Sequence, residues 1–409
     1  MPGPGYAFLG HEERENVEKV LESWELTRFK RDNPNNPSFV DVFERLVERS
    51  FSAAHCVAVN SGTSALLTAL AALDIGPGDE VIVPGYTFVA SIGSIIYSGA
   101  TPVLAEVDES LTLDPADVER RITPRTKAIM AVHMLGAPCD MNALTRLAER
   151  HGLLLIEDVA QACGASHEGR RLGTIGAAGA FSLNPFKVIT SGEGGFFLTN
   201  DDHTHQRGYS FQDQGWFPGR TDIGSGDVLF GLNLRMADLA GAVACAQWEK
   251  LDHVLSETRR VKKQLADAVP ERPGVRRRVL HDAAGECGTL LVYVFDRVAD
   301  AQSVAAALDT KTLVDSGRHH YANMPQLAEL SKPGGRPSPF RRGGEEGGHS
   351  YLPGSLPRTD DVLARSVAVA IGVSDSYLGA GFGVTVRSDD EEIAKAADRL
   401  SSTLDGVLG

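Results

Sequence analysis

The sequence lacks the features of a membrane-spanning or secreted protein. No apolar run reaches the roughly 20 residues that a transmembrane helix needs. The N-terminal stretch MPGPGYAFLGHEEREN has neither the positively charged part nor the apolar part of a secretory signal. Only five cysteines occur in 409 residues; they are scattered and form no CxxC pair, which argues against a disulfide framework or a zinc site. We therefore expect reduced thiols, no metal and a cytoplasmic protein.

An excess of positive charge is also missing. The chain has 40 Lys and Arg against 54 Asp and Glu, a net charge of −14. This balance disfavours non-specific binding to nucleic acid or to an anionic membrane, so we expect neither partner. A small anionic substrate stays possible, because it needs only a local group of donors.

The composition is that of an ordinary globular protein, and the apolar pattern indicates alternating strands and helices. Hydrophobic residues make up 42% and charged residues 23%, and the length suggests two domains. Between about residues 57 and 200, short apolar runs alternate with longer segments, five of them with room for a crossover helix. This pattern predicts a mostly parallel sheet covered by helices on both faces, with ligands at the carboxyl ends of the strands. The runs cover 57–59, 81–84, 102–107, 128–132, 153–158, 179–183 and 194–200.

The rest of the chain predicts helices and a smaller region. Apolar spacing indicates a helix with Val17, Val20, Leu21 and Trp24 on one face, and a second helix over 40–51. A long helix after residue 235 links two domains in this interpretation, and an α+β region follows from about residue 256. The Gly/Pro/Arg-rich segment 331–350 is expected to be a loop.

The segment NSGTSALLTALAAL places Ser61, Gly62 and Thr63 after a strand and at the start of a helix. Backbone N–H groups and the helix dipole make such a place an anion site, although a simple helix cap explains the same residues. Neither GxxxxGK[ST] nor GxGxxG occurs, which argues against a nucleoside triphosphate or a dinucleotide.

An acid and a lysine follow later strands. Asp158 ends the run LLLIED, where a carboxylate needs a partner; it either holds a cation or caps a helix. Lys187 lies beside Phe186, Val188 and Ile189, where a low dielectric would favour the neutral, nucleophilic amine. A surface lysine with a buried stem is the alternative.

Seven motifs in order resemble the DegT/StrS-type sugar aminotransferases, which are fold-type I enzymes dependent on pyridoxal 5′-phosphate (PLP). The resemblance is strong over about residues 55–255 and weaker elsewhere. Within the family, the short sequence runs look most similar to those of the amino-octulosonate transaminase branch. The motifs are NSGTSAL, PGYTFVAS, GATPVLAEVD, VHMLGAPCDM, IEDVAQACGA, FSLNPFKVITSGEGG and GLNLRMADLAGAVACAQ.

The resemblance implies a role for each matching residue. Lys187 resembles the Schiff-base lysine, Asp158 the partner of the pyridinium nitrogen, and Gln161 the residue near the ring hydroxyl. Phe88 resembles the residue that stacks on the cofactor. Asn233 resembles one that reaches the phosphate from the other subunit, which implies a homodimer with shared sites; a helix cap is its alternative role. The residues that resemble phosphate ligands are Gly62, Thr63 and Ser182.

Other positions are weaker candidates. The run Asn184-Pro185-Phe186-Lys187-Val188 departs from the family where His-Pro and a following Asn are frequent, so contacts through those side chains do not carry over. His319 and Tyr321 are candidates for the sugar pocket. His133 and Cys163 are expected to be structural, and Arg336, Arg341 and Arg342 either bind a nucleotide diphosphate or lie in a solvated loop.

Together these features predict a large PLP-binding α/β domain with an N-terminal helical segment at 1–255, and a small α+β domain at 256–409. The expected activity moves an amino group from L-glutamate or L-glutamine to a keto or aldehyde sugar, nucleotide-linked and possibly of eight carbons, or to a cyclitol. A PLP-dependent sugar dehydratase and a non-catalytic regulatory protein of the same fold are the alternatives. The retained lysine favours transamination over dehydration, and the complete set of Lys187, Asp158 and Ser182 argues against a regulator.

Overall fold

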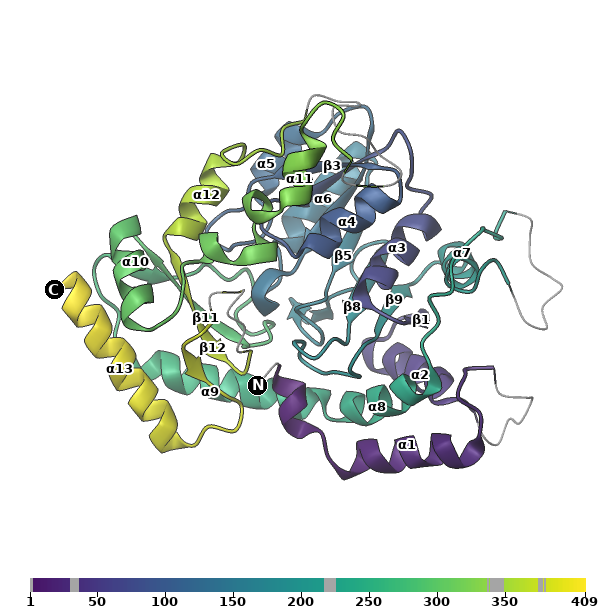
Figure 1. The fold of residues 1–409 in the computed structure, drawn as a ribbon, viewed down its shortest axis with the longest axis horizontal. Helices are drawn as coiled ribbons and strands as arrows, with labels where there is room; N and C mark the ends of the chain where they lie inside the picture. Colours follow the sequence, from purple (N-terminus) through teal and green to yellow (C-terminus); the bar gives the residue numbers. More distant parts are fainter. Residues whose placement is uncertain are drawn as a thin grey trace.

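The structure is a computed structural model that describes residues 3–29, 37–216, 226–336, 338, 349–373, 378 and 380–409. Its centre is a seven-stranded sheet in the order β1-β9-β8-β5-β4-β2-β3 (Figure 1). Only β9 runs against the other strands, because it pairs antiparallel with both β1 and β8. The strands are β1 (His55–Val59), β2 (Glu80–Pro84), β3 (Thr101–Ala105), β4 (Thr126–Val132), β5 (Leu154–Asp158), β8 (Ala178–Ser182) and β9 (Gly195–Thr199).

Helices cover both faces of this sheet, which explains why its strands are apolar without alternation. On β2, Val81 and Val83 belong to a core cluster with helices α3 and α4, whereas Ile82 belongs to a second cluster with α2 and α6. The helices of this part are α1 (His11–Ser23), α2 (Phe39–Phe51), α3 (Gly62–Ala72), α4 (Val89–Tyr97), α5 (Pro115–Arg121), α6 (Met141–His151), α7 (Asp202–Gln212) and α8 (Asp238–Glu249). The predicted mostly parallel sheet, covered on both faces, is confirmed.

A second sheet of four strands, in the order β10-β11-β12-β13, lies beside the first (Figure 1). One of its faces packs against helix α9 (Leu251–Ala268) and helix α13 (Asp390–Leu408). On its other face, Leu290 and Val292 join the same core cluster as the large sheet. The strands are β10 (Val275–Arg277), β11 (Leu290–Phe295), β12 (Ser366–Ile371) and β13 (Gly383–Val384), and the further helices are α10 (Val298–Ala307), α11 (Pro325–Leu330) and α12 (Pro357–Ala364).

Short elements complete the chain. A two-stranded ribbon pairs β6 (Ser166–His167) with β7 (Arg170–Arg171). The 3₁₀ turns are η1 (Pro4–Phe8), η2 (Met134–Gly136), η3 (Leu313–Asp315), η4 (Gly317–His319) and η5 (Tyr321–Asn323). No helix in the described ranges is long and apolar enough to cross a membrane. All five cysteines fall within these ranges, and each is a buried free thiol.

The predicted positions of the helices agree with the structure, but the predicted buried face of the first helix does not. The helices expected near 17–24 and over 40–51 are α1 and α2. Of the four residues predicted for one face of α1, only Val20 is buried, whereas Leu21 is 55% exposed and Trp24, just past the helix end, is 90% exposed. The predicted boundary after residue 255 falls inside α9, so one continuous helix belongs to both proposed domains and the division at 255 stays a prediction.

Candidate active site

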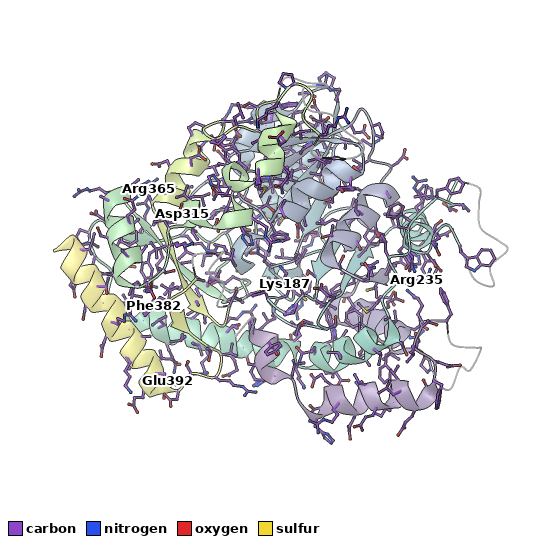
Figure 2. All side chains as sticks on the ribbon, viewed as in Figure 1. Lys187, Arg235, Asp315, Arg365, Phe382 and Glu392 are labelled. Atoms are coloured by element: carbon purple, nitrogen blue, oxygen red, sulfur yellow. The ribbon has the colours of Figure 1, made fainter. Side chains whose placement is uncertain are left out.

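A cavity of about 320 Å³ opens at the carboxyl ends of the parallel strands. Lys187 lies near the middle of the molecule, between the two sheets (Figure 2). Eight of the ten residues that the sequence singled out line this cavity, although they come from separate segments of the chain. They are Gly62, Thr63, Phe88, Asp158, Gln161, Ser182, Lys187 and His319.

One end of the cavity is the N-terminus of α3. The Ser61 hydroxyl caps this helix by accepting from the N–H of Ser64 at 3.1 Å. The N–H groups of Gly62 and Thr63 come before the first intrahelical bond of that end, so they have no partner in the helix itself. A Cβ on Gly62 would lie 2.6 Å from the Cβ of Ser182, so only glycine fits between the helix end and strand β8. This arrangement suits a phosphate group.

The cavity is also lined by Asp158, at the end of β5. Its side chain is buried, and Oδ1 accepts from the N–H of Ala160 at 3.1 Å. Oδ2 accepts from the Ser91 hydroxyl at 2.7 Å. Since Ser91 gives its only proton to Asp158, Thr87 is the donor in the 2.7 Å contact between the Thr87 and Ser91 hydroxyls. These bonds fix the direction of the carboxylate.

The pair behind Asp158 is structural, as expected for His133. Both His133 and Glu157 are fully buried, and their side chains lie 3.2 Å apart. Nδ1 of His133 accepts from the N–H of Cys139, which places the ring proton on Nε2, the atom that faces Glu157. Glu157 also accepts from three backbone N–H groups of residues 173–176. Cys163 is likewise fully buried and belongs to the core.

Phe88 stands at the centre of a group of nitrogen-bearing side chains. The Lys187 Nζ lies 5.9 Å from the centre of the Phe88 ring, and the Arg318 guanidinium lies 5.4 Å from it. The His319 ring lies 5.2 Å from the same ring, tilted by 47°. Lys187 itself is half-buried, with Val188 and Ile189 buried beside it and Phe186 46% exposed.

Gln161 lines the cavity from the loop after β5. Its Oε1 accepts from the N–H of Leu135 at 2.9 Å. A backbone N–H can pair only with the oxygen of the amide, so Nε2 remains as a donor for other partners.

Two of the predicted residues do not line the cavity. Tyr321 is fully buried, and its hydroxyl donates to Asp360 at 3.1 Å and accepts from the N–H of Leu356 at 3.0 Å. Asn233 is exposed, and α8 begins only at Asp238 with Ala237 as its N-cap, so the alternative of a helix cap for Asn233 is wrong.

Among the lining residues with polar side chains, Thr87, Ser91, Arg318 and Glu193 were not predicted from the sequence. Thr87 and Ser91 lie in the motif PGYTFVAS. Their hydroxyl groups, placed after a strand and at the start of a helix, were the signal that could have identified them as site residues. Arg318 directly precedes His319, and only the fold shows that both reach Phe88. Arg336 does not line the cavity, and Arg341 and Arg342 lie outside the described residues.

The lining fits PLP in three separate respects. The Gly62 cradle suits its phosphate, the fixed carboxylate of Asp158 suits a protonated ring nitrogen, and Phe88 offers a face for an aromatic ring. Among the described residues no group of three or more potential metal ligands occurs.

Comparison with known proteins agrees with this fit. The model of the DegT/DnrJ/EryC1/StrS aminotransferase family matches residues 9–329. A GDP-perosamine synthase of Caulobacter vibrioides is 43% identical over 231 residues, which cover 54% of this chain and 60% of that protein. An L-glutamine:2-deoxy-scyllo-inosose aminotransferase of Micromonospora echinospora is 39% identical over 307 residues, covering 68% of this chain and 71% of that protein. The chain thus spans about 60% of the length of the first curated relatives that it matches.

Solved structures give the same picture over almost the whole chain. DesV of S. venezuelae, in complex with a ketimine intermediate, has a TM-score of 0.75 and 30% identity, and the match covers 96% of this chain and 94% of DesV. An aminotransferase from Psychrobacter cryohalolentis has a TM-score of 0.78 and 26% identity, with all of both chains covered. The fold is therefore that of the PLP-dependent aminotransferases, and the cofactor of this family is PLP.

Proposed function

Because the chain belongs to the DegT/DnrJ/EryC1/StrS aminotransferase family, we propose that it is a PLP-dependent aminotransferase that acts on a sugar. The amino donor in this proposal is L-glutamate or L-glutamine, and the acceptor is a keto or aldehyde sugar. The observation that carries the proposal is the meeting of Lys187, Asp158 and Phe88 in one cavity, with the N-terminus of α3 at its end. A lysine, an acid and an aromatic ring at these places are what PLP chemistry needs.

When bound, PLP supplies an electron sink for the charge left on the substrate carbon and carries the amino group between the two substrates. Asp158 holds the proton on the ring nitrogen, which keeps that sink effective. The bonds from Ser91 and Ala160 hold its carboxylate in one orientation. Phe88 stacks on the ring, and Gly62, Thr63 and Ser182 bind the phosphate.

Lys187 has two tasks in this proposal. Its Nζ anchors the cofactor before the donor amine arrives. As a free, neutral amine, Nζ would act as a general base and then a general acid, moving a proton from the substrate Cα to the cofactor carbon on the other side of the shared nitrogen. Arg318 and His319 lie beside Phe88 on the side of the second domain, so they are placed to contact the sugar or the carboxylate of the donor.

The choice of acceptor rests on the relatives. GDP-perosamine synthases by their name make a nucleotide-linked sugar, and the inosose aminotransferases act on a cyclitol with L-glutamine. We therefore keep a nucleotide-linked keto sugar as the first candidate and a keto cyclitol as the second. An eight-carbon sugar remains a prediction that rests only on the similarity of short sequence motifs to one branch of the family.

We further propose that two copies share each site. Exposed apolar side chains occur on the segment of Asn233 and on two other segments, near residues 24–29 and at Trp216, and such exposed apolar residues are typical of a surface that binds another protein. The guanidinium of Arg235 lies 5.6 Å from the centre of the Phe29 ring. This contact brings the segment that contains Phe29 next to the segment that contains Asn233 and Arg235. The exposed apolar residues are Trp24, Leu26, Phe29, Trp216, Val228, Phe230 and Leu232.

A spectroscopic assay tests the proposed activity. The protein loaded with PLP should be yellow, and L-glutamate or L-glutamine should remove this colour as the amino group is transferred to the cofactor. Adding keto sugars or keto cyclitols one at a time should restore the colour only with the true acceptor. A yellow protein that no amino donor decolourises would favour a regulator, and release of water from the sugar without transfer of nitrogen would favour a dehydratase.

A further inference from the structure

The turn after strand β4 holds an uncommon backbone conformation beside the cavity. Leu135 lies in the left-handed region (φ 58°, ψ 33°), which residues with a Cβ rarely adopt. The side chain of Leu135 is buried, and Gly136 follows with φ 75°. Such a conformation persists only where the surrounding structure holds it in place.

Arg278, just after β10, makes contacts that hold this turn. Its guanidinium donates to the carbonyl oxygen of Met134 at 3.3 Å and to that of Leu135 at 3.0 Å. The side chain of Arg278 is only 2% exposed, and its own N–H donates to Val292 of β11 at 3.0 Å. A buried guanidinium fixed to the second sheet and bonded to two successive carbonyls is a rigid clamp, because no water can replace those bonds.

A carboxylate makes this buried charge tolerable. Glu286 lies 3.7 Å from the Arg278 guanidinium and also pairs with Lys262. Burial of a charge without such a partner would be costly. The N–H of Cys287, next to Glu286, donates to the carbonyl of Gly136 at 2.8 Å, so the same segment holds the turn a second time.

The turn in its place orients Gln161. The N–H of Leu135 donates to Oε1 of Gln161, and this bond decides which atom of the amide is fixed and which is left as a donor. If the turn relaxed, the N–H of Leu135 would move, and the amide of Gln161 would lose the bond that distinguishes its two ends.

We propose that Arg278 is a positioning residue for the cofactor: it holds the turn Met134–Gly136 so that Gln161 presents its Nε2 to the ring oxygen of PLP. This inference rests on the proposed function, with the cofactor ring stacked on Phe88 and the ring hydroxyl near Gln161. A donor at the ring oxygen stabilises negative charge there. Without it, the oxygen would hold the proton shared with the Lys187 nitrogen more strongly, and the pH at which the visible absorbance changes would rise.

The test compares Arg278→Met, Gln161→Ala and the double variant. PLP affinity is measured by titrating each protein with the cofactor, and the pH dependence of the visible absorbance is recorded on the loaded proteins. We expect each single variant to bind PLP roughly tenfold more weakly, on the scale of one hydrogen bond to a charged group, and to shift the absorbance change to higher pH. The double variant should be no weaker than Gln161→Ala alone, because Arg278 acts through Gln161.

Arg276→Met is the matched control. Arg276 lies two residues away in β10 but makes exposed ion pairs with Glu109 and Asp296. Its loss should leave both the PLP affinity and the pH profile unchanged. If it moves them as much as Arg278→Met does, general loosening of the second sheet explains the data and the inference is wrong.

A second variant covers the case in which Arg278→Met does not fold. Arg278→Lys keeps the cation but cannot bond both carbonyls in the same geometry, so it should show the same two effects in weaker form. If the Arg278 variants lower only thermal stability while Gln161→Ala changes affinity and pH profile, the Arg278 inference fails and the ring placement stands. If Gln161→Ala itself changes neither quantity, the ring placement fails, and the role of Arg278 falls with it.

Discussion

The amine of Lys187 and the ring of Phe88 are close enough for a cation–π contact, with 5.9 Å between Nζ and the ring centre. A flat cofactor ring stacked on Phe88 would therefore come within reach of the amine without a large movement of the chain. The guanidinium of Arg318, in the turn η4, lies near the same ring. The Lys187 side chain thus lies near the proposed position of the cofactor ring and does not extend into solvent.

Replacing Lys187 with alanine should abolish turnover while the protein still folds. The amine is half-buried and lines an open cavity, so its loss removes chemistry and little packing. The variant should also lack the yellow absorbance near 420 nm, an approximate value for the bound cofactor. Circular dichroism would confirm the fold, and normal turnover in this variant would show that the lysine has been misassigned.

Asp158→Asn should reduce kcat by at least about 100-fold, the scale of removing one key electrostatic group. The amide keeps the shape of the side chain, but its NH2 group cannot accept, so it keeps at most one of the two bonds from Ser91 and Ala160, and it cannot hold a proton on the ring nitrogen. Thermal unfolding should change little by comparison. If the variant retains wild-type kcat, another group pairs with the ring nitrogen.

Gly62→Ala should weaken PLP binding without unfolding α3. Alanine is a good helix former, so the change should not destabilise the helix itself. The added Cβ would lie 2.6 Å from Ser182, and one of these two walls of the cradle must move. Equilibrium dialysis against PLP measures the effect, and Gly93→Ala is the control because a Cβ there meets no atom within 4 Å. Equal affinities for the two variants would place the phosphate elsewhere.

At the scale of elements, the N-terminal segment supports the loop that carries Lys187. A Cβ on Gly3 would lie 2.4 Å from the carbonyl oxygen of Lys187, and one on Gly5 would lie 2.6 Å from the Cα of Ile189. The segment thus runs backbone against backbone along this loop. Glu13 of α1 anchors it, with bonds to Lys250 at 2.7 Å and to Gln247 at 2.8 Å.

Glu13→Gln should lower the free energy of unfolding by about 1–3 kcal/mol near neutral pH, the scale of lost hydrogen bonds to a buried charge. Burial opposes the ionised form of Glu13, but the bonds from Lys250 and Gln247 outweigh it and lower the pKa of its carboxyl. A lowered pKa stabilises the fold above the ordinary carboxyl range and loses this effect as pH falls. Denaturant unfolding should therefore show the two proteins converging below about pH 4. A constant difference down to acid pH would mean that the charge of Glu13 does not contribute.

The elements were predictable because their signals are local. Each apolar run from 57–59 to 194–200 became a strand, since residues such as Val81 and Ile82 pack on opposite faces of one covered sheet. Lys187 and Asp158 were predicted from the sequence because Asp158 ends a strand of the parallel sheet and Lys187 follows one, and ligands bind at such strand ends; both line the cavity, and their roles stay a prediction.

What the sequence could not supply was contact between distant segments. The bond from Ser91 to Asp158 joins residues 67 positions apart, and that from Arg278 to Leu135 joins residues 143 apart. Tyr321 was misjudged for the same reason: its hydroxyl serves a buried bond to Asp360, 39 residues later, which no local pattern announces.

At the scale of the whole molecule, the surface around Asn233 bears on the proposal that two copies share each site. Phe230 and Leu232 are largely exposed next to Asn233, and Trp216 is 65% exposed on the neighbouring segment. Asn233 does not line the cavity of its own chain. If it binds the phosphate in the partner's cavity, no single chain has a full site, and PLP should stabilise the dimer because it binds only where both subunits meet.

Mixing two inactive variants tests this shared site. Lys187→Ala removes the lysine of one chain, and Asn233→Ala removes the contact that this chain would receive from its partner. In a mixed dimer with Asn233 acting across the interface, both defects fall in one site and the other site is wild type. Activity should then rise toward roughly a quarter of the wild-type value, because about half of the dimers are mixed and each has one intact site. If subunits exchange, as shown by two tags on one dimer, and activity does not rise, Asn233 serves its own chain and the two sites are separate.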